Sequence, residues 1–355
     1  MLNIQKKTVA VLFGGCSTEY GVSLKSAASV IDHLDESQYD LVLIGITREG
    51  AWLRYGGGTE DIREDRWQTH PSCLPAFLSP SREAAGIVEL AGTEYRLTPV
   101  DVVFPVLHGR NGEDGTVQGL LELAGIPFVG CGSLSSAVCM DKGIASQLVK
   151  AAGVDTALSI TVYEGEDLYT AVKEAEPLGF PLYIKPARSG SSFGITKAYD
   201  KLELMEGIRS AFAHDTKVIV EQNVAGFEVG CAVLGDVDPL IGEIDEIELK
   251  GEFFDFDEKY SLISSTIHLP ARIAEETAAR IKETARRIYR TLGCSGLARV
   301  DMFIGTDGRI VFNEVNTMPG FTAASRYPNM MRASHISYPE LMDRLIRLAL
   351  ARGAS

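Results

Sequence analysis

The sequence contains few cysteines, and none of them forms a C-x-x-C pair. The six cysteines are scattered along the 355 residues, at Cys16, Cys73, Cys131, Cys139, Cys231 and Cys294. This spacing argues against a zinc site, and scattered cysteines are typical of a reduced cytosolic protein. We therefore expect a cytoplasmic location.

Long apolar runs are also missing. No stretch approaches the roughly 18 apolar residues that a transmembrane helix needs. The apolar run after the first lysines extends only from Val9 to Phe13, and no small-residue cleavage site follows it. We expect a first β-strand there, and not a signal peptide.

Positive charge is in the minority. Lys+Arg number 34 and Asp+Glu number 48, so the formal net charge is −14. A protein of this sign is not expected to bind nucleic acid or an anionic membrane through bulk charge. Apolar residues make up 45% of the chain and charged residues 23%, as in soluble globular proteins. We expect neither nucleic acid nor a membrane as a partner.

Strand and helix signals alternate in the first third of the chain. Buried strands such as TVAVLFGG and VDVVFPVLHG alternate with amphipathic helices, which predicts an α/β unit with a doubly wound parallel sheet. Residues 55–100 interrupt the pattern, and we interpret them as an insertion with one hairpin, IVELAGTEYRLTP. The remainder is typical of α+β structure with antiparallel strands, and the length predicts two or three domains.

Four helices are expected beyond the first third. They are predicted at about 135–152, 201–213, 272–292 and 338–351. The third of these has apolar residues at helical spacing. A long loop is expected over 250–266.

The strongest chemical signal is the hairpin in LARVDMFIGTDGRIVFNEVNTMPG, residues 297–320. Its Asp-Gly pair predicts a two-residue turn. That turn places Asp301 opposite Glu314, and Arg299 opposite Asn316, on one face of the sheet. Two opposed carboxylates cost about 0.2–1 kcal/mol, which a hard cation between them would offset. An oxygen-lined site of Asp301, Glu314 and Asn316 suits Mg²⁺ that also contacts substrate phosphates.

A loop of small residues, RSGSSFG at 188–194, follows Lys185. Glycines let backbone N–H groups approach a polyphosphate, and a nearby lysine supplies a point charge. The Walker A pattern is absent, and a flexible hairpin loop is the alternative interpretation. Lys142 could serve similarly, although a lone lysine on a helix is usually a solvated surface residue.

Other candidate residues lie at strand ends. EQNVAGFE at 221–228 follows a buried strand and could hold an adenine edge and, through Glu228, ribose hydroxyls. The alternative is an ordinary connection between strands. His108 and Glu19 follow buried strands at the carboxyl edge of the first sheet, where ligands bind in open α/β sheets. The alternative to a binding role for His108 is a loop histidine whose hydrogen bonds are all made within the protein.

Together these stretches resemble one family along nearly the whole chain. FGGCSTEYGVSLKSA, LHGRNGEDGTVQG, MDK, IKPARSGSSFG, EKY, LGCSGLARVDMF and NEVNTMPGFT occur in the order found in the D-alanine–D-alanine ligases of the ATP-grasp superfamily. The resemblance implies an ATP-grasp fold. It implies an N-terminal Rossmann-like domain over 1–133, a central subdomain over 134–225, and a C-terminal subdomain over 226–355 with the metal site and a lid at 250–266. A homodimer is expected from the family.

The resemblance also assigns the nucleotide site. Phosphates would meet Lys142, Lys185 and Lys259. Adenine would be held by Glu221 and the backbone near Val224, and ribose by Glu228. Two Mg²⁺ ions, for which Mn²⁺ may substitute, would be held by Asp301, Glu314 and Asn316.

The same resemblance assigns the first substrate, D-alanine. Its ammonium would pair with Glu19, and its carboxylate would lie near His108 and attack the γ-phosphate to form an acyl phosphate. Arg299 and backbone N–H groups around Gly320 would stabilise the later tetrahedral centre. Ser191 and Tyr260, hydrogen-bonded with Glu19, would position the substrate and order the lid. This chemistry needs concentrated positive charge and exclusion of water.

The second substrate depends on Ser325-Arg326. Typical D-alanine–D-alanine ligases carry Ser-Leu or Ser-Met there, and this chain resembles the vancomycin-resistance D-alanine–D-serine ligases of the VanG type. Arginine makes the second pocket more polar and favours a hydroxyl group. D-Lactate enzymes replace the lid tyrosine, whereas this chain keeps Tyr260 and has His268 in the following strand. We therefore predict D-serine, with D-alanine second and D-lactate third.

Two other functions stay open. An ATP-binding regulatory module without turnover would bind ATP but would not show D-alanine-dependent hydrolysis. A different ATP-grasp ligase would share the metal hairpin, but would not need Glu19, His108 and the Ser191–Tyr260 pair together.

Overall fold

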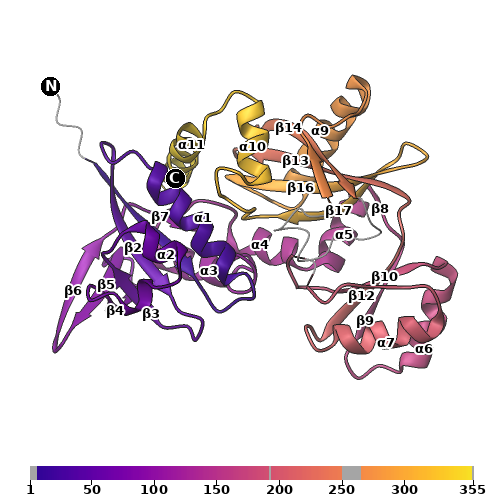
Figure 1. The fold of residues 1–355 in the computed structure, drawn as a ribbon, viewed down its shortest axis with the longest axis horizontal. Helices are drawn as coiled ribbons and strands as arrows, with labels where there is room; N and C mark the ends of the chain where they lie inside the picture. The colour runs from indigo at the N-terminus through magenta and orange to yellow at the C-terminus, as the bar shows by residue number, and fades with distance from the viewer. Residues whose placement is uncertain (1–5, 192, 250–264, 354–355) are drawn as a thin grey trace.

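Three separate β-sheets organise the protein (Figure 1). The computed structural model describes residues 6–191, 193–249 and 265–353. The three sheets have seven, four and six strands. The functional residues predicted above come from all three of them.

The first sheet has the strand order β6-β5-β4-β3-β2-β1-β7. Its strands are β1 (Lys7–Gly14), β2 (Tyr39–Ile46), β3 (Trp52–Tyr55), β4 (Leu74–Leu78), β5 (Gly86–Ala91), β6 (Glu94–Pro99) and β7 (Val102–Pro105). Only β2, β1 and β7 are parallel, whereas the pairs from β2–β3 to β5–β6 are antiparallel. The segment that we interpreted as an insertion therefore extends the sheet. The connection from β2 to β3 is too short for the crossover that a parallel pair needs.

Helices cover both faces of this sheet. They are α1 (Tyr20–His33), α2 (Thr59–Arg63), the 3₁₀ turn η1 (Trp67–Thr69) and α3 (Thr116–Ala124). Alternate residues of β1 enter two different cores: Val9 and Val11 pack with α1, and Ala10 and Leu12 pack with α3. This burial on both faces explains why β1 is a continuous apolar run.

The second sheet is antiparallel, in the order β11-β10-β12-β9. Its strands are β9 (Ser159–Tyr163), β10 (Leu182–Pro186), β11 (Thr196–Ala198) and β12 (Lys217–Gln222). It packs with α6 (Leu168–Ala175), η2 (Glu176–Leu178) and α7 (Lys201–Ala211). This unit lies at the lower right of Figure 1.

The third sheet has the order β15-β14-β13-β16-β17-β8. Its strands are β8 (Asp155–Thr156), β13 (Gly226–Leu234), β14 (Leu240–Leu249), β15 (Ser265–His268), β16 (Leu297–Gly305) and β17 (Ile310–Asn316). Its core includes residues of α4 (Ser133–Met140), α5 (Lys142–Ala151) and α9 (Glu275–Thr291). The single helix predicted at 135–152 is thus two helices. They meet at Asp141, which leaves helical geometry and caps α5 by accepting a hydrogen bond from Ile144 N at 3.0 Å.

The β16–β17 hairpin confirms the predicted pairing at its site end and differs at its turn. Asp301 pairs with Glu314, and Arg299 with Asn316. Nearer the turn, Met302 pairs with Phe312, one residue out of the predicted register. The turn therefore has three residues, 306–308, and a bulge at Asn313 restores the register before the site.

Two helices end the described chain, of which the first packs on β13 and β14 and the second contacts β7 and α1. They are α10 (Arg326–Ala333) and α11 (Tyr338–Gly353). Figure 1 shows α11, in yellow, beside α1 and β7, and both helices share a core with the outer residues of β1. The sequence did not predict α10, because Pro328 disfavours a helix except in its first turn, where it stands here. No helix in the described residues is long and apolar enough to cross a membrane.

Candidate active site

Glu19 lies where two loops meet. It precedes α1 and is buried, and its carboxylate accepts a hydrogen bond from the Ser191 hydroxyl, as predicted. A Cβ atom on Gly109 or on Gly190 would lie 2.5 Å from Glu19 Oε2. Both glycines therefore leave room for the carboxylate, and one comes from each of the two loops that the sequence singled out.

Lys142 contacts both the loop of small residues at 188–194 and the β16–β17 hairpin, which carries the predicted metal ligands. It is the first residue of α5, and its Nζ donates to Ser189 O at 2.7 Å and lies 3.4 Å from Glu314 Oε2. Asp141 forms a buried ion pair with Lys217 Nζ at 2.7 Å, which fixes the start of α5 against β12. Lys142 thus lies in the site, and not on a solvated face.

Lys185 and Glu221 form an ion pair across β10 and β12. Lys185 is also 3.4 Å from Asn313 Oδ1, the bulged residue of β17. Burial alone would lower the pKa of Lys185, but the carboxylate of Glu221 raises it above its usual value. Lys185 therefore remains a cation at neutral pH, as a phosphate ligand must.

A row of carboxylates crosses the third sheet. Gly230 on β13 pairs with Asp245 on β14 and with Asp301 on β16, and Asp301 pairs with Glu314 on β17. Paired residues point to the same face, so Asp245, Asp301 and Glu314 share it. Asp245 and Asp301 are each 1% exposed. Asp245 was not among the predicted site residues, because its place in the row depends on the pairing of three strands.

The guanidinium of Arg326 packs against Gly230, in the space that a side chain at position 230 would occupy. Its guanidinium forms a bidentate pair with Asp245, with both N–O distances at 2.7 Å, and lies 3.6 Å from Asp301 and 3.7 Å from Glu228. A Cβ on Gly230 would collide with Nη2 of Arg326. Burial would lower the pKa of Arg326, but Asp245 and Asp301 together raise it above its usual value.

Arg299 holds the next position on the same face. Its Nε and Nη2 donate to Asp301 at 2.8 and 2.7 Å, and Asn316 Nδ2 donates to Asp301 at 2.9 Å. Burial opposes the charge of Arg299, whereas Asp301 raises its pKa. The face is therefore a network of buried cations and carboxylates with little net charge.

The predicted metal ligands fit a hard cation by their chemistry. Asp301, Glu314 and Asn316 offer two carboxylates and an amide oxygen on two adjacent strands, which suits Mg²⁺. Lys142, which would contact phosphates, approaches Glu314. In the described residues no cluster of three His, Cys, Asp or Glu side chains forms a metal site, so the amide and substrate oxygens would have to complete the ligand set.

His108 and Glu113 contact the turn after β17. His108 is buried, with Nδ1 at 2.9 Å from Met318 O and Nε2 at 3.1 Å from Ser26 Oγ. Glu113 accepts from Gly109 N at 2.8 Å and from Met318 N at 3.0 Å. Burial lowers the pKa of His108. Burial and the nearby Glu19 carboxylate raise the pKa of Glu113 to about 8. The quoted motif HGRNGEDG contained Glu113, but the sequence alone showed no partner for it.

Gly320 and Ser325 both lie in the segment between β17 and α10. Ser325 Oγ accepts from Thr322 N at 3.0 Å, and a Cβ on Gly320 would lie 3.3 Å from Ser325 Oγ. The side chain of Ser325 therefore stabilises the turn before α10. Lys259, Tyr260 and the 250–264 part of the predicted lid lie outside the described residues.

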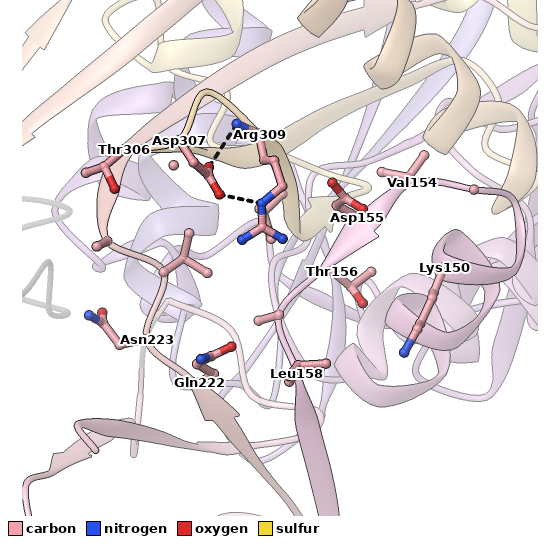
Figure 2. Close-up of a pocket in the computed structure, with 16 residues that line it drawn as sticks. Lys150, Val154, Asp155, Thr156, Leu158, Gln222, Asn223, Thr306, Asp307 and Arg309 are labelled. Atoms are coloured by element: carbon pink, nitrogen blue, oxygen red, sulfur yellow. Dashed lines mark hydrogen bonds and ion pairs between the residues drawn. The ribbon is translucent and has the colours of Figure 1, made fainter. Parts of the chain in front are cut away.

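A separate cavity of about 570 Å³ lies beside Val224, at the connection between β12 and β13. Figure 2 shows it lined by Asn223, Thr156 and the ion pair of Asp307 with Arg309. Of the predicted site residues, Val224 contributes to its lining. It is therefore distinct from the network around Glu19, Asp301 and Arg326.

Comparisons with known proteins cover almost the whole chain. Residues 8–131 match a family model described as D-ala D-ala ligase N-terminus, and residues 148–347 match D-ala D-ala ligase C-terminus. The solved structure of VanG D-Ala:D-Ser ligase from Enterococcus faecalis is 52% identical with a TM-score of 0.90, covering 97% of this chain and 100% of that one.

Two curated relatives carry other names. The D-alanine–D-alanine ligase of Caldicellulosiruptor bescii is 45% identical over 98% of this chain and 96% of its own. The putative D-alanine–D-lactate ligase of Streptomyces coelicolor is also 45% identical, over 96% of this chain and 97% of its own. Sequence identity to these two relatives is thus equal, although their names give different second substrates.

Proposed function

Because the chain belongs to the D-alanine–D-alanine ligase family of ATP-dependent ligases, which have the ATP-grasp fold, we propose that it joins D-alanine to D-serine. The reaction would proceed through a D-alanyl phosphate and release ADP. The product would supply a modified peptidoglycan precursor of the kind that confers vancomycin resistance.

The observation that carries the choice of D-serine is the buried pair of Arg326 and Asp245. Asp245 holds two guanidinium nitrogens at 2.7 Å, so the guanidinium plane is fixed by a charge-assisted bidentate contact. An apolar residue at 326 would leave Asp245 buried without its cation. The pair instead supplies fixed polar groups where a hydroxymethyl group could bind and a methyl group would gain nothing.

Glu19 would bind the ammonium of the first D-alanine. Its carboxylate is fixed by Ser191 and enclosed by Gly109 and Gly190, and burial strengthens a charge pair. The substrate carboxylate would then face Arg299 and the turn at Gly320. Tyr260 would complete the Glu19–Ser191 pair when the lid closes.

ATP would lie between the second and third sheets. Lys142, Lys185 and Lys259 would bind phosphates, Glu221 and the backbone near Val224 the adenine, and Glu228 the ribose. Mg²⁺ bound by Asp301, Glu314 and Asn316 would neutralise charge on the transferring phosphoryl group. The residues of the chain would orient ATP and exclude water from the acyl phosphate.

D-Alanine as the second substrate is the alternative that the Caldicellulosiruptor bescii relative supports. D-Lactate ranks third, since Tyr260 is retained in the sequence. We further propose the subdomain bounds 1–133, 134–225 and 226–355, a homodimer and a cytoplasmic location.

Phosphate release with ATP, Mg²⁺ and D-alanine, with and without D-serine, tests the proposal. D-Alanine-dependent phosphate release with mainly D-Ala–D-Ser as product would support it. Mainly D-Ala–D-Ala would reject the choice of D-serine. ATP binding without phosphate release would reject the ligase activity in favour of a binding module.

A further inference from the structure

Three backbone groups of the turn over residues 317–321 are held by side chains from α1 and from the loop that follows β7, the last strand of the first sheet. Met318 N donates to Glu113 at 3.0 Å, and Met318 O lies 2.9 Å from Nδ1 of His108. Phe321 N donates to Ser26 Oγ at 3.2 Å. The turn follows β17 of the third sheet, but its conformation is set by α1 and the loop after β7.

The hydrogen-bond chemistry fixes the tautomer of His108. A backbone carbonyl only accepts, so Nδ1 of His108 must carry the proton that is donated to Met318 O. Nε2 is then an acceptor, and it receives the Ser26 hydroxyl proton at 3.1 Å. The oxygen of Ser26 is left to accept from Phe321 N. Because burial lowers the pKa of His108, this neutral form is the stable one, and the contacts form one consistent chain.

Glu113 completes the arrangement from the other side of Met318. It uses one oxygen for Met318 N and the other for Gly109 N. The Gly109 backbone also borders the Glu19 carboxylate. The part of the site that would bind the substrate ammonium is therefore connected, through one carboxylate, to the turn that contains Gly320.

We propose that Glu113, His108 and Ser26 are positioning residues, which aim the Gly320 backbone N–H at the oxyanion of the tetrahedral centre. This inference rests on the proposed ligase function. His108 was expected near the substrate carboxylate, but both of its ring nitrogens are used by Met318 O and Ser26 Oγ, so none of the three side chains needs to touch the substrate. They act by keeping Met318 and Phe321 in place on either side of Gly320.

The consequence concerns the fate of the acyl phosphate. In ligation the neutral amine forms a bond to the acyl carbon, the bond from that carbon to the phosphate oxygen breaks, and a proton passes from nitrogen to the released phosphate. In hydrolysis water takes the place of the amine and regenerates D-alanine. A displaced Gly320 N–H slows the catalysed attack, whereas uncatalysed attack by water does not depend on the turn. Displacement of the Gly320 N–H therefore raises the number of phosphates released per dipeptide formed.

Two substitutions of His108 distinguish loss of the hydrogen bond to Met318 O from the loss of the histidine side chain itself. In His108→Asn the amide nitrogen can take the place of Nδ1 and still donate to Met318 O. In His108→Gln it takes the place of Nε2 and the contact with Met318 is lost. Glu113→Gln removes one of the two acceptors, because the amide nitrogen only donates, whereas both oxygens of a carboxyl group keep acceptor capacity even when it is protonated. Glu122→Gln is the matched control, since Glu122 also accepts a backbone N–H, from Ser133 at 2.8 Å, and uses its other oxygen for the hydroxyl of the same residue.

The experiment measures phosphate and dipeptide together, with ATP, Mg²⁺, D-alanine and D-serine. We expect about one phosphate per dipeptide for the wild type, for Glu122→Gln and nearly so for His108→Asn. For His108→Gln and Glu113→Gln we expect a ratio of two or more and a kcat lowered about 10-fold, with KM for ATP unchanged.

Equal ratios in His108→Asn and His108→Gln, or a ratio of one in Glu113→Gln, would overturn the proposal while the ligase function stands. Failure of the wild type to release phosphate would overturn both. Thermal unfolding of each variant identifies losses of activity that come from misfolding.

Discussion

The two sides of the active site handle buried charge in different ways. On the third sheet, Arg299 and Arg326 pair with Asp301 and Asp245, so each charge has a counter-charge on a rigid strand. On the loops of the first sheet, Glu113 relies on backbone N–H groups, and its pKa rises because burial and Glu19 disfavour its ionisation. The sheet side is therefore electrostatically complete before substrate binds. On the loop side, Glu19 is buried between Gly109 and Gly190, where an ammonium group could pair with its carboxylate.

The largest effect is expected on the loop side. Glu19→Gln keeps the shape of the side chain and removes the charge that would pair with the substrate ammonium. We expect kcat/KM for the first D-alanine to fall by about 100-fold or more, the cost of removing one partner from a buried charge pair. Steady-state kinetics measure it, with Glu122→Gln as control. A fall of less than about 3-fold would show that the ammonium binds elsewhere.

On the sheet side, removing a charge should reduce stability as well as activity. Asp245→Asn leaves Arg326 with only the more distant Asp301 and Glu228. We expect the free energy of unfolding to fall by about 3 kcal/mol, the lower end of the range for a broken buried pair. Urea unfolding measures this loss. The double variant with Arg326→Met should lose less than the sum of the single variants, and simple additivity would mean that the pair is not coupled.

The pH dependence of stability should come from the loop side. An unfolded glutamate loses its proton at its ordinary pKa, whereas Glu113 keeps it up to a pKa of about 8. The native state thus binds more protons between these values, and stability falls with rising pH. The contribution of Glu113 is fully present below its unfolded pKa and is lost as the pH passes about 8. Urea midpoints at several pH values should show the wild type losing stability relative to Glu113→Gln, and parallel curves would contradict this.

The smallest effect is expected outside both regions. Asp200 accepts hydrogen bonds from Leu202 N and Glu203 N at 2.8 and 2.9 Å and caps α7 in the second sheet unit. Asp200→Ala should cost roughly 1 kcal/mol of stability. kcat and both KM values should stay at wild-type levels when the folded fraction is corrected for. A selective change in kcat would mean that this unit moves as part of the reaction.

The sequence predicted the parts of the site that depend on local pattern. The opposed carboxylates followed from one hairpin, and their pairing is confirmed because the error in the turn is cancelled by the bulge at Asn313. The contact of Ser191 with Glu19 followed from the family resemblance. The roles of these residues remain predictions.

The parts that were missed depend on contacts between distant segments. Asp245 enters the site only because β13 pairs with both β14 and β16. Glu113 and Met318 are more than 200 positions apart, and no sequence period links them. α10 was missed because its proline masks a helical pattern of only eight residues. Hydrophobic period and turn chemistry report neighbours along the chain, and they carry no information on such pairings.

We proposed that Arg326, fixed by Asp245 beside Gly230, selects D-serine. The most direct measurement is the ratio of D-Ala–D-Ser to D-Ala–D-Ala formed with equimolar D-alanine and D-serine, for the wild type, Arg326→Met and Gly230→Ala. The alanine at 230 would meet both Arg326 Nη2 and Asp245 Oδ1, so it should displace the pair without removing either charge. The account predicts mainly D-Ala–D-Ser for the wild type, and a ratio lowered about 10-fold or more in both variants. An unchanged ratio in Arg326→Met would contradict it.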